Sequence, residues 1–125
     1  PGCGTQHAIA NALVSISGEP WMALGTPGDC IFTVPQVLLT ILEYGWNPYK
    51  AIDAPRFWPL RDDWTIELEN RISPEVIKEL KRRGIMPRPL GEYYWPMGSM
   101  QCIWRSGEEY KGTADPRRLG MALGY

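Results

Sequence analysis

The first third of this chain constrains its fold most, because a hairpin pattern there passes directly into a helix pattern. Residues 12–25 have the pattern of a hairpin, in which Leu13–Ile16 and Trp21–Leu24 are strand-like runs around a turn-rich segment. The segment Gly25–Asp29 is expected to break regular structure. Gly45 ends the helix that follows, whose apolar face comprises Val34, Val37, Leu38, Ile41 and Leu42. Strands and a helix so close together predict a mixed α and β fold.

The middle of the chain predicts a short helix and a strand. Asn47 followed by Pro48 is typical of a helix start, and this helix is expected to stop before Pro55. Trp64–Glu69 alternates strictly between apolar and polar residues and predicts a half-exposed strand. The acidic side chains of this strand and of Glu75 are expected on a solvated face.

The last third predicts one more helix and a final pair of strands. Ser73–Glu75 has the cap-and-proline pattern of a helix start, and the buried side of this helix is expected to comprise Val76, Ile77 and Leu80. The proline-rich stretch Pro87–Pro96 is expected to be irregular. Met100–Trp104 and the run around Tyr110 predict two strands joined by a turn.

The composition excludes several classes of partner. The 125 residues include 13 Lys and Arg against 14 Asp and Glu, so we expect neither nucleic acid nor an anionic membrane surface as a partner. No apolar run approaches the ~20 residues of a membrane helix. The widely spaced Cys3, Cys30 and Cys102 form no CxxC pattern, which predicts reduced, mostly buried thiols and no metal site. No cofactor is expected.

One loop and one histidine are the candidates for chemistry that the residues themselves offer. Gly25–Asp29 lies between a predicted strand and a predicted helix, where backbone amides can face a developing oxyanion, although its composition equally fits a plain turn. His7, the single histidine, lines a pocket or lies on the surface. Asp53–Arg56 and Asp115–Arg118 each set a carboxylate near an arginine, which suits either a carboxylate ligand or a structural ion pair.

Five segments, in order, resemble the C-terminal part of γ-glutamyltransferase and its relatives, which are N-terminal-nucleophile hydrolases. They are Gly25–Gly28, Gln36–Pro48, Lys50–Phe57, Gly98–Ile103 and Gly112–Arg118. The order and spacing agree over essentially all of residues 7–125. On this resemblance, residues 1–125 are identified as one unit, the C-terminal part of a small subunit of this family.

The resemblance implies an α+β fold, the C-terminal portion of an αββα sandwich in which two stacked β-sheets lie between helices. It also implies a precursor that cleaves itself, so that a freed N-terminal threonine is the nucleophile and its α-amine the base. That threonine and the family's main carboxylate-binding groups lie upstream of the matched region, so no catalytic residue is expected on this chain. Arg56 and Arg117 are assigned to architecture.

Two family features match positions in this sequence. The family's Pro-Gly-Gly loop, whose backbone amides lie at the oxyanion site, implies that Gly28 and Asp29 are oxyanion-side residues, with Thr26 in the adjoining substrate pocket. Asp29 replaces the second glycine, and its carboxylate would oppose an oxyanion if it pointed inward. His7–Ala8 matches a Ser-Ser pair that contacts the substrate carboxylate in γ-glutamyltransferases. The resemblance thus places the histidine in the pocket and favours a related amide or acyl-amide substrate.

The implied activity is hydrolysis or transfer of an amide-linked acyl group, γ-glutamyl or related, through a threonine outside this chain. The expected partners are the upstream segment or subunit that carries the threonine, in a hetero-oligomer, and a small-molecule amide. The alternative is a catalytically inactive remnant or binding module of the same fold, favoured by the changed glycine and the missing serines. Unpaired cysteines favour a cytoplasmic location.

Overall fold

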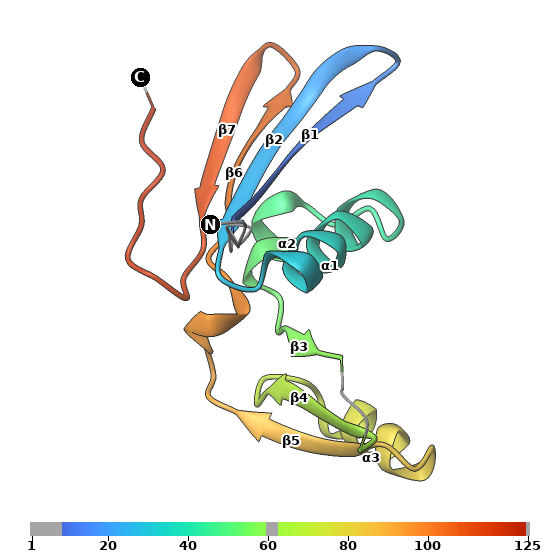
Figure 1. Cartoon of the computed structure of the whole chain (residues 1–125). Helices are drawn as coiled ribbons and strands as arrows, with labels where there is room; N and C mark the ends of the chain where they lie inside the picture. The colour runs from blue at the N-terminus through green and yellow to red at the C-terminus, as the bar shows by residue number, and fades with distance from the viewer. Residues whose placement is uncertain (1–8, 60–62, 125) are drawn as a thin grey trace, which may run out of the picture.

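The computed structural model describes residues 9–59 and 63–124 and contains two β-sheets (Figure 1). The larger sheet is antiparallel, with strand order β1-β2-β6-β7. Its strands are Ile9–Ile16, Glu19–Pro27, Gln101–Ser106 and Glu109–Ala114. Two helices, α1 (Cys30–Leu42) and α2 (Pro48–Asp53), pack on one face of this sheet.

The smaller sheet has the order β3-β4-β5 and lies beyond one end of the larger sheet (Figure 1). Its strands are Phe57–Trp58, Thr65–Glu69 and Met86–Leu90. Helix α3 (Pro74–Arg82) connects β4 to β5, which run parallel. A short 3-10 helix, η1 (Trp95–Met97), leads the chain back to β6.

The hairpin β1–β2 is confirmed, and it turns at Ser17–Gly18, whose φ values are both positive (52° and 84°). Positive φ at both central residues is typical of a type I′ turn, whose twist matches that of the two strands it joins. Strand β2 runs farther than predicted, since it includes Gly25–Pro27. Gly25 pairs with Asn11 of β1 on one side and with Gln101 of β6 on the other. Hydrogen bonding to both neighbouring strands thus keeps this segment in the sheet, despite the tendency of glycine and proline to break strands. The loop before α1 is therefore only Gly28–Asp29.

One hydrophobic core lies between the larger sheet and its two helices. It contains Met22, Leu24, Val37, Ile41, Ala51, Ile52, Met100, Cys102 and Trp104. The predicted apolar face of α1 is confirmed, except that Leu42 is 51% exposed. Cys30 and Cys102 are free and buried, as predicted, while Cys3 falls outside the described residues. Burial raises the pKa of the Cys102 thiol to about 11.

The two helices that begin at a proline are capped as predicted, but α3 is not buried as predicted. Asn47 accepts a hydrogen bond from the Tyr49 amide, and Ser73 accepts one from the Val76 amide. The expected buried side of α3 is wrong for Val76, which is 48% exposed, and Ile77 and Leu80 are only partly buried, so no residue of this helix is fully buried. The cause is geometric: α3 contacts chiefly β5, at the edge of a small sheet.

Pro87 and Pro89 lie in strand β5, so the prediction of irregular chain there is wrong. β5 is an edge strand, and among the described residues it pairs with β4 alone. The Met86 amide donates to the Trp64 carbonyl (2.8 Å). Because successive residues of a strand point their amides to opposite sides, both prolines present their missing amide to the open edge. The strand thus loses no ladder hydrogen bond to either proline.

The described residues leave much of the other face of the larger sheet exposed, and we call this the open face. Side chains alternate between the faces of a strand, and those that point away from α1 and α2 include Ile9, Leu13 and Ile103, all exposed. The chain after β7 lies against part of this face, where Ala122 approaches Gly112. No helix of the described ranges is long and apolar enough to cross a membrane.

Candidate functional site

The loop Gly28–Asp29 joins β2 to the N-terminus of α1. Gly28 has a φ of 83°, in the left-handed region that favours glycine. Its carbonyl accepts a hydrogen bond from the Cys30 amide (2.8 Å), and the Asp29 carbonyl accepts one from the Thr33 amide (3.2 Å). The loop is therefore a tight turn that opens directly into a 13-residue helix. The N-terminus of such a helix favours negative charge nearby.

A second segment, Pro96–Ser99, lies against this loop, and we call it the bridge segment. The Asp29 amide donates to the Pro96 carbonyl (3.2 Å). The Thr33 hydroxyl, in the first turns of α1, donates to the Met97 carbonyl (2.6 Å). The bridge segment thus holds both the loop and the start of the helix that follows it.

Thr26 connects the other side of the loop to the bridge segment. Its hydroxyl oxygen accepts a hydrogen bond from the Ser99 amide (2.8 Å), and the hydroxyl donates to the Pro27 carbonyl (2.9 Å). Thr26 is 1% exposed. Because the hydroxyl is committed to backbone groups of this chain, the geometry gives Thr26 a supporting role beneath the loop. Its contact with a substrate stays a prediction.

Two glycines allow the loop and the bridge segment to approach this closely. A Cβ atom on Gly28 would lie 3.1 Å from the Pro96 carbonyl oxygen. A Cβ atom on Gly98 would lie 2.7 Å from the Thr26 hydroxyl oxygen and 3.1 Å from that of Thr33. Neither position has room for a side chain without movement of the backbone or of a buried threonine.

The Asp29 side chain occupies the N-cap position of α1 but makes no capping hydrogen bond. Burial raises the pKa of its carboxyl, while the nearby Phe32 amide and Trp58 indole act in the opposite direction. The Trp58 indole nitrogen is itself buried without a hydrogen-bond partner among the described residues, so the carboxyl and the indole are neighbours without bonding. This carboxylate is thus less solvated than a surface aspartate and incompletely compensated.

The structure brings together three of the four residues assigned to the site from the sequence. Thr26, Gly28 and Asp29 are consecutive or nearly so and share the bridge segment as a neighbour. His7 falls outside the described residues, and its place in the pocket stays a prediction. The oxyanion-side roles of Gly28 and Asp29 also stay predictions. The Asp29 amide is committed to the Pro96 carbonyl, so the Gly28 amide is the better candidate donor.

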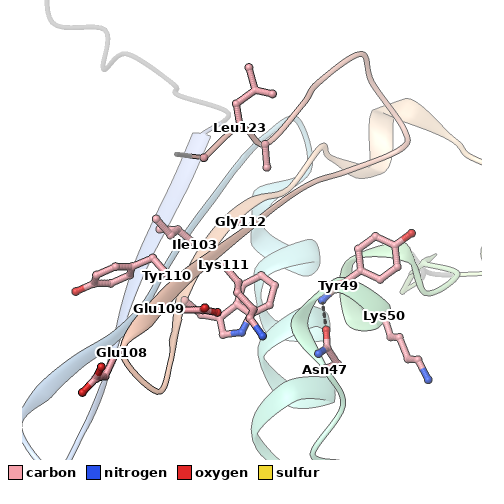
Figure 2. A pocket seen from close by; sticks show the side chains of 13 residues that line it. Asn47, Tyr49, Lys50, Ile103, Glu108, Glu109, Tyr110, Lys111, Gly112 and Leu123 are labelled. Atoms are coloured by element: carbon pink, nitrogen blue, oxygen red, sulfur yellow. Dashed lines mark hydrogen bonds between the residues drawn. The ribbon is translucent and has the colours of Figure 1, made fainter.

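A groove of about 1400 Å³ lies elsewhere, along the edge strand β7 (Figure 2). It is lined by the start of α2, the β6–β7 hairpin and the chain end near Leu123. Its polar side chains, among them Lys50, Glu109 and Lys111, carry both signs of charge. No residue of the Gly28–Asp29 loop lines this groove, so it is not part of the candidate site.

Four charged side chains, each at most 5% exposed, form a cluster next to the bridge segment: Arg56, Glu69, Asp115 and Arg117. Arg117 pairs with Glu69 (2.5 Å) and with Asp115 (3.1 Å), and Arg56 pairs with Asp115 (2.5 Å). These contacts confirm that both arginines serve architecture. Each carboxylate is compensated by at least one guanidinium, as burial of a charge requires.

Glu69 corrects the prediction that the acidic residues of β4 face solvent, since it is 0% exposed. It accepts hydrogen bonds from the amides of Arg56 and Tyr94 and from the guanidinium groups of Arg71 and Arg117. Strict alternation of apolar and polar residues predicts a strand with one face exposed to solvent. At the end of β4 that prediction is wrong, because donors from distant segments enclose the carboxylate.

Sequence reasoning singled out Gly98 and Ser99 as part of a motif, but it missed the contact of the bridge segment with the loop and the role of Thr33. One signal was present: Thr33 lies on the core face of α1 with Val37 and Ile41. A buried threonine among apolar residues needs a hydrogen-bond partner. The sequence cannot name that partner, the Met97 carbonyl, which comes from 64 residues away.

Comparison with known families decides the classification. The model of the family described as Gamma-glutamyltranspeptidase matches residues 1–125. The chain belongs to this family. It is 32% identical over 128 residues to the glutathione hydrolase-like YwrD proenzyme of Bacillus subtilis (strain 168), and 34% identical over 126 residues to the glutathione hydrolase proenzyme of Escherichia coli (strain K12). These alignments cover 96% and 94% of this chain but only 24% and 20% of the two relatives.

Solved structures of the gamma-glutamyltranspeptidase family share the fold. Gamma-glutamyltranspeptidase from Pseudomonas nitroreducens, complexed with L-DON, superposes with a TM-score of 0.84 at 27% identity, over 100% of this chain and 66% of that one. The transpeptidase CapD of Bacillus anthracis has a TM-score of 0.80 at 22% identity, which supports the fold alone. The predicted α+β fold of an N-terminal-nucleophile hydrolase is confirmed. Within it, the described residues form the four-stranded sheet with α1 and α2 on one face, and the smaller three-stranded sheet.

Proposed function

We propose that this chain is the C-terminal part of the small subunit of an enzyme that hydrolyses or transfers an amide-linked acyl group. The observation that carries the proposal is the Gly28–Asp29 loop, held rigidly at the N-terminus of α1 in a chain that matches the family over its whole length. Relatives from Escherichia coli and Pseudomonas are named glutathione hydrolase proenzymes, so γ-glutamyl amides are the first substrates to test. Related acyl amides come second.

The reaction follows from a threonine supplied by a segment outside this chain. Its hydroxyl attacks the amide carbonyl, its α-amine takes the proton, and the carbonyl oxygen becomes an oxyanion. The Gly28 amide and the dipole of α1 are the groups here that can stabilise that charge. As the tetrahedral intermediate collapses, the α-ammonium returns its proton to the amide nitrogen, the C–N bond breaks to release the amine, and an acyl-threonine ester remains. Water or a second amine then takes the acyl group.

The partner that carries the threonine is expected to cover the open face of the larger sheet. That face exposes Ile9, Leu13 and Ile103. The chain after β7 adds Leu119, Met121 and Leu123, which are also exposed. Contiguous apolar surface of this kind is typical of an interface. The hetero-oligomer and a cytoplasmic location remain part of the proposal.

The test uses the full-length protein that contains this chain, assayed with γ-glutamyl and simple acyl p-nitroanilides. Gly28→Val adds a branched side chain where a Cβ would already lie 3.1 Å from the Pro96 oxygen and where φ is positive. If the loop serves the oxyanion, kcat falls by about 10²-fold or more, since one oxyanion donor is worth that much. Gly18→Val is the matched control, because Gly18 also has positive φ but open space around it. Equal rates for the two variants would remove the loop from catalysis.

A second candidate, a binding module without catalysis, is favoured by Asp29. Its carboxylate lies where the family has glycine, and its amide is occupied by Pro96. Intact-mass measurement separates the two candidates after incubation with an acyl p-nitroanilide. An acyl adduct on an N-terminal threonine supports the enzyme. A protein that is neither processed nor acylated supports the binding module.

A further inference from the structure

The buried ion cluster meets the bridge segment through one side chain, Arg56. Its Nη1 atom donates to the carbonyls of Met97 and Gly98, both at 3.1 Å. Its Nη2 atom donates to Asp115 Oδ2 (2.5 Å), and the same carboxylate oxygen accepts the Met100 amide (2.8 Å). The guanidinium and its carboxylate therefore fix the bridge segment and the residue that leaves it.

The Met97 carbonyl links this cluster to the loop. It accepts from Arg56 on one side and from the Thr33 hydroxyl of α1 on the other. One residue earlier, the Pro96 carbonyl accepts the Asp29 amide. A shift of the bridge segment would therefore move the loop and the first turns of α1 together.

We propose that Arg56 is a positioning residue for acyl transfer, which holds the Gly28–Asp29 loop through the bridge segment so that the Gly28 amide faces the oxyanion. The catalytic consequence rests on the proposed function, whereas the positioning does not. Arginine is required because its planar fork reaches three carbonyls and a carboxylate at once. A lysine ammonium is a single point charge on a flexible stem.

Arg117 provides a matched control inside the same cluster. Like Arg56, it is buried, bonds Asp115 and donates to the Ile52 carbonyl. Its remaining donors go to Glu69 and to the Ala54 carbonyl, and none of its hydrogen bonds reaches the bridge segment. The two arginines thus share a structural role, and only Arg56 contacts the segment that supports the loop.

The experiment compares Arg56→Lys with Arg117→Lys in the full-length protein, by kinetics and by hydrogen–deuterium exchange of peptides covering residues 24–34. We expect both variants to lower the melting temperature. Arg56→Lys should also lower kcat by about 10- to 100-fold, because small misplacements of a site are that costly, with KM changed by less than about threefold. It should accelerate exchange in the loop peptides. Arg117→Lys should leave both the loop exchange and kcat close to wild type.

Unchanged loop exchange in Arg56→Lys, or equal effects of the two variants on the loop, would overturn the proposal. If Arg56→Lys does not fold, Thr33→Val replaces with a methyl group the hydroxyl that donates to the Met97 carbonyl. It should accelerate loop exchange in the same way, and failure to do so is equally decisive. A wild-type protein that turns over no amide refutes the proposed function, while the exchange comparison still decides the positioning.

Discussion

The two sheets of this protein are stabilised by different physics. The larger sheet and helices α1 and α2 enclose a continuous apolar core of nine residues. The smaller sheet buries Leu68 at its centre, but its helix α3 has no buried residue. Where β4 ends, the interior consists of charged groups instead, with Glu69 enclosed by arginine and amide donors. Apolar burial is non-directional, whereas a buried carboxylate needs its donors at defined positions.

This difference matters for the site because the bridge segment connects the two regions. An apolar core tolerates exchange of one side chain for another of similar volume. A buried ion cluster does not tolerate the loss of one partner, because the remaining charge stays buried without compensation. The loop thus follows a strand of the larger sheet, but the bridge segment that holds it is fixed by the buried ion cluster, which is the region less tolerant of substitution.

The largest effect is expected for Glu69→Ala. It removes one of the two carboxylate partners of Arg117 and the acceptor of two backbone amides, and we expect a loss of about 3–5 kcal/mol in the free energy of unfolding. Glu79→Ala is the matched control, since Glu79 also pairs with two arginines but is exposed on α3. Its loss should be several-fold smaller because exposed pairs contribute little. Denaturant unfolding of both variants measures the difference, and similar losses would contradict the role assigned to the cluster.

A smaller effect is expected from truncating the same residue type in the two amphipathic helices. Val37→Ala in α1 removes a side chain that is 2% exposed, and we expect a loss of about 2 kcal/mol in unfolding free energy. Val76→Ala in α3 removes one that is 48% exposed, and the change should stay within about 0.5 kcal/mol. Thermal unfolding with calorimetry checks both. A large loss at Val76 would mean that a surface outside the described residues covers α3.

Local sequence signals predicted most of the larger sheet and its helices because their causes are local. The hairpin turn, the helix caps and the apolar period of α1 each depend on residues within a few positions of one another. The five motif segments predicted the family and the α+β fold. They also predicted the loop that now contains Gly28 and Asp29.

The errors arose where distant segments decide the environment. Pro87 and Pro89 suggested irregular chain, and only the position of β5 at a sheet edge makes them compatible with a strand. Glu69 had the pattern of a surface residue, and its partner Arg117 comes from 48 positions along the chain. The bridge segment overlaps the matched motif Gly98–Ile103, but its contact with the loop was not predicted, because the need for Gly98 depends on Thr26 and Thr33, which come from distant positions in the chain.

The smallest effect compares two aspartates from the two regions, by melting temperature between pH 7 and pH 3. Burial raises the pKa of Asp29, so its ionisation costs more in the folded protein than in the unfolded chain. Hydrogen bonds from Thr65 lower the pKa of Asp63, so its ionisation stabilises the fold. At pH 7, Asp29→Asn should therefore raise the melting temperature slightly, and Asp63→Asn should lower it.

The pH dependence separates this cause from simple packing changes. The gain from Asp29→Asn should fade as pH falls through its raised folded-state pKa toward the unfolded value, because the wild-type carboxyl then becomes protonated in both states. The loss from Asp63→Asn should fade as pH falls through the unfolded value toward the lowered folded one, where the wild type loses the same charge. A gain at Asp29 that persists at pH 3 would mean that the new amide makes a hydrogen bond, with the Trp58 indole as the nearest unpaired donor among the described residues. The gain from Asp29→Asn would then come from that hydrogen bond, and the charge of the Asp29 carboxylate would not lower the stability of the fold.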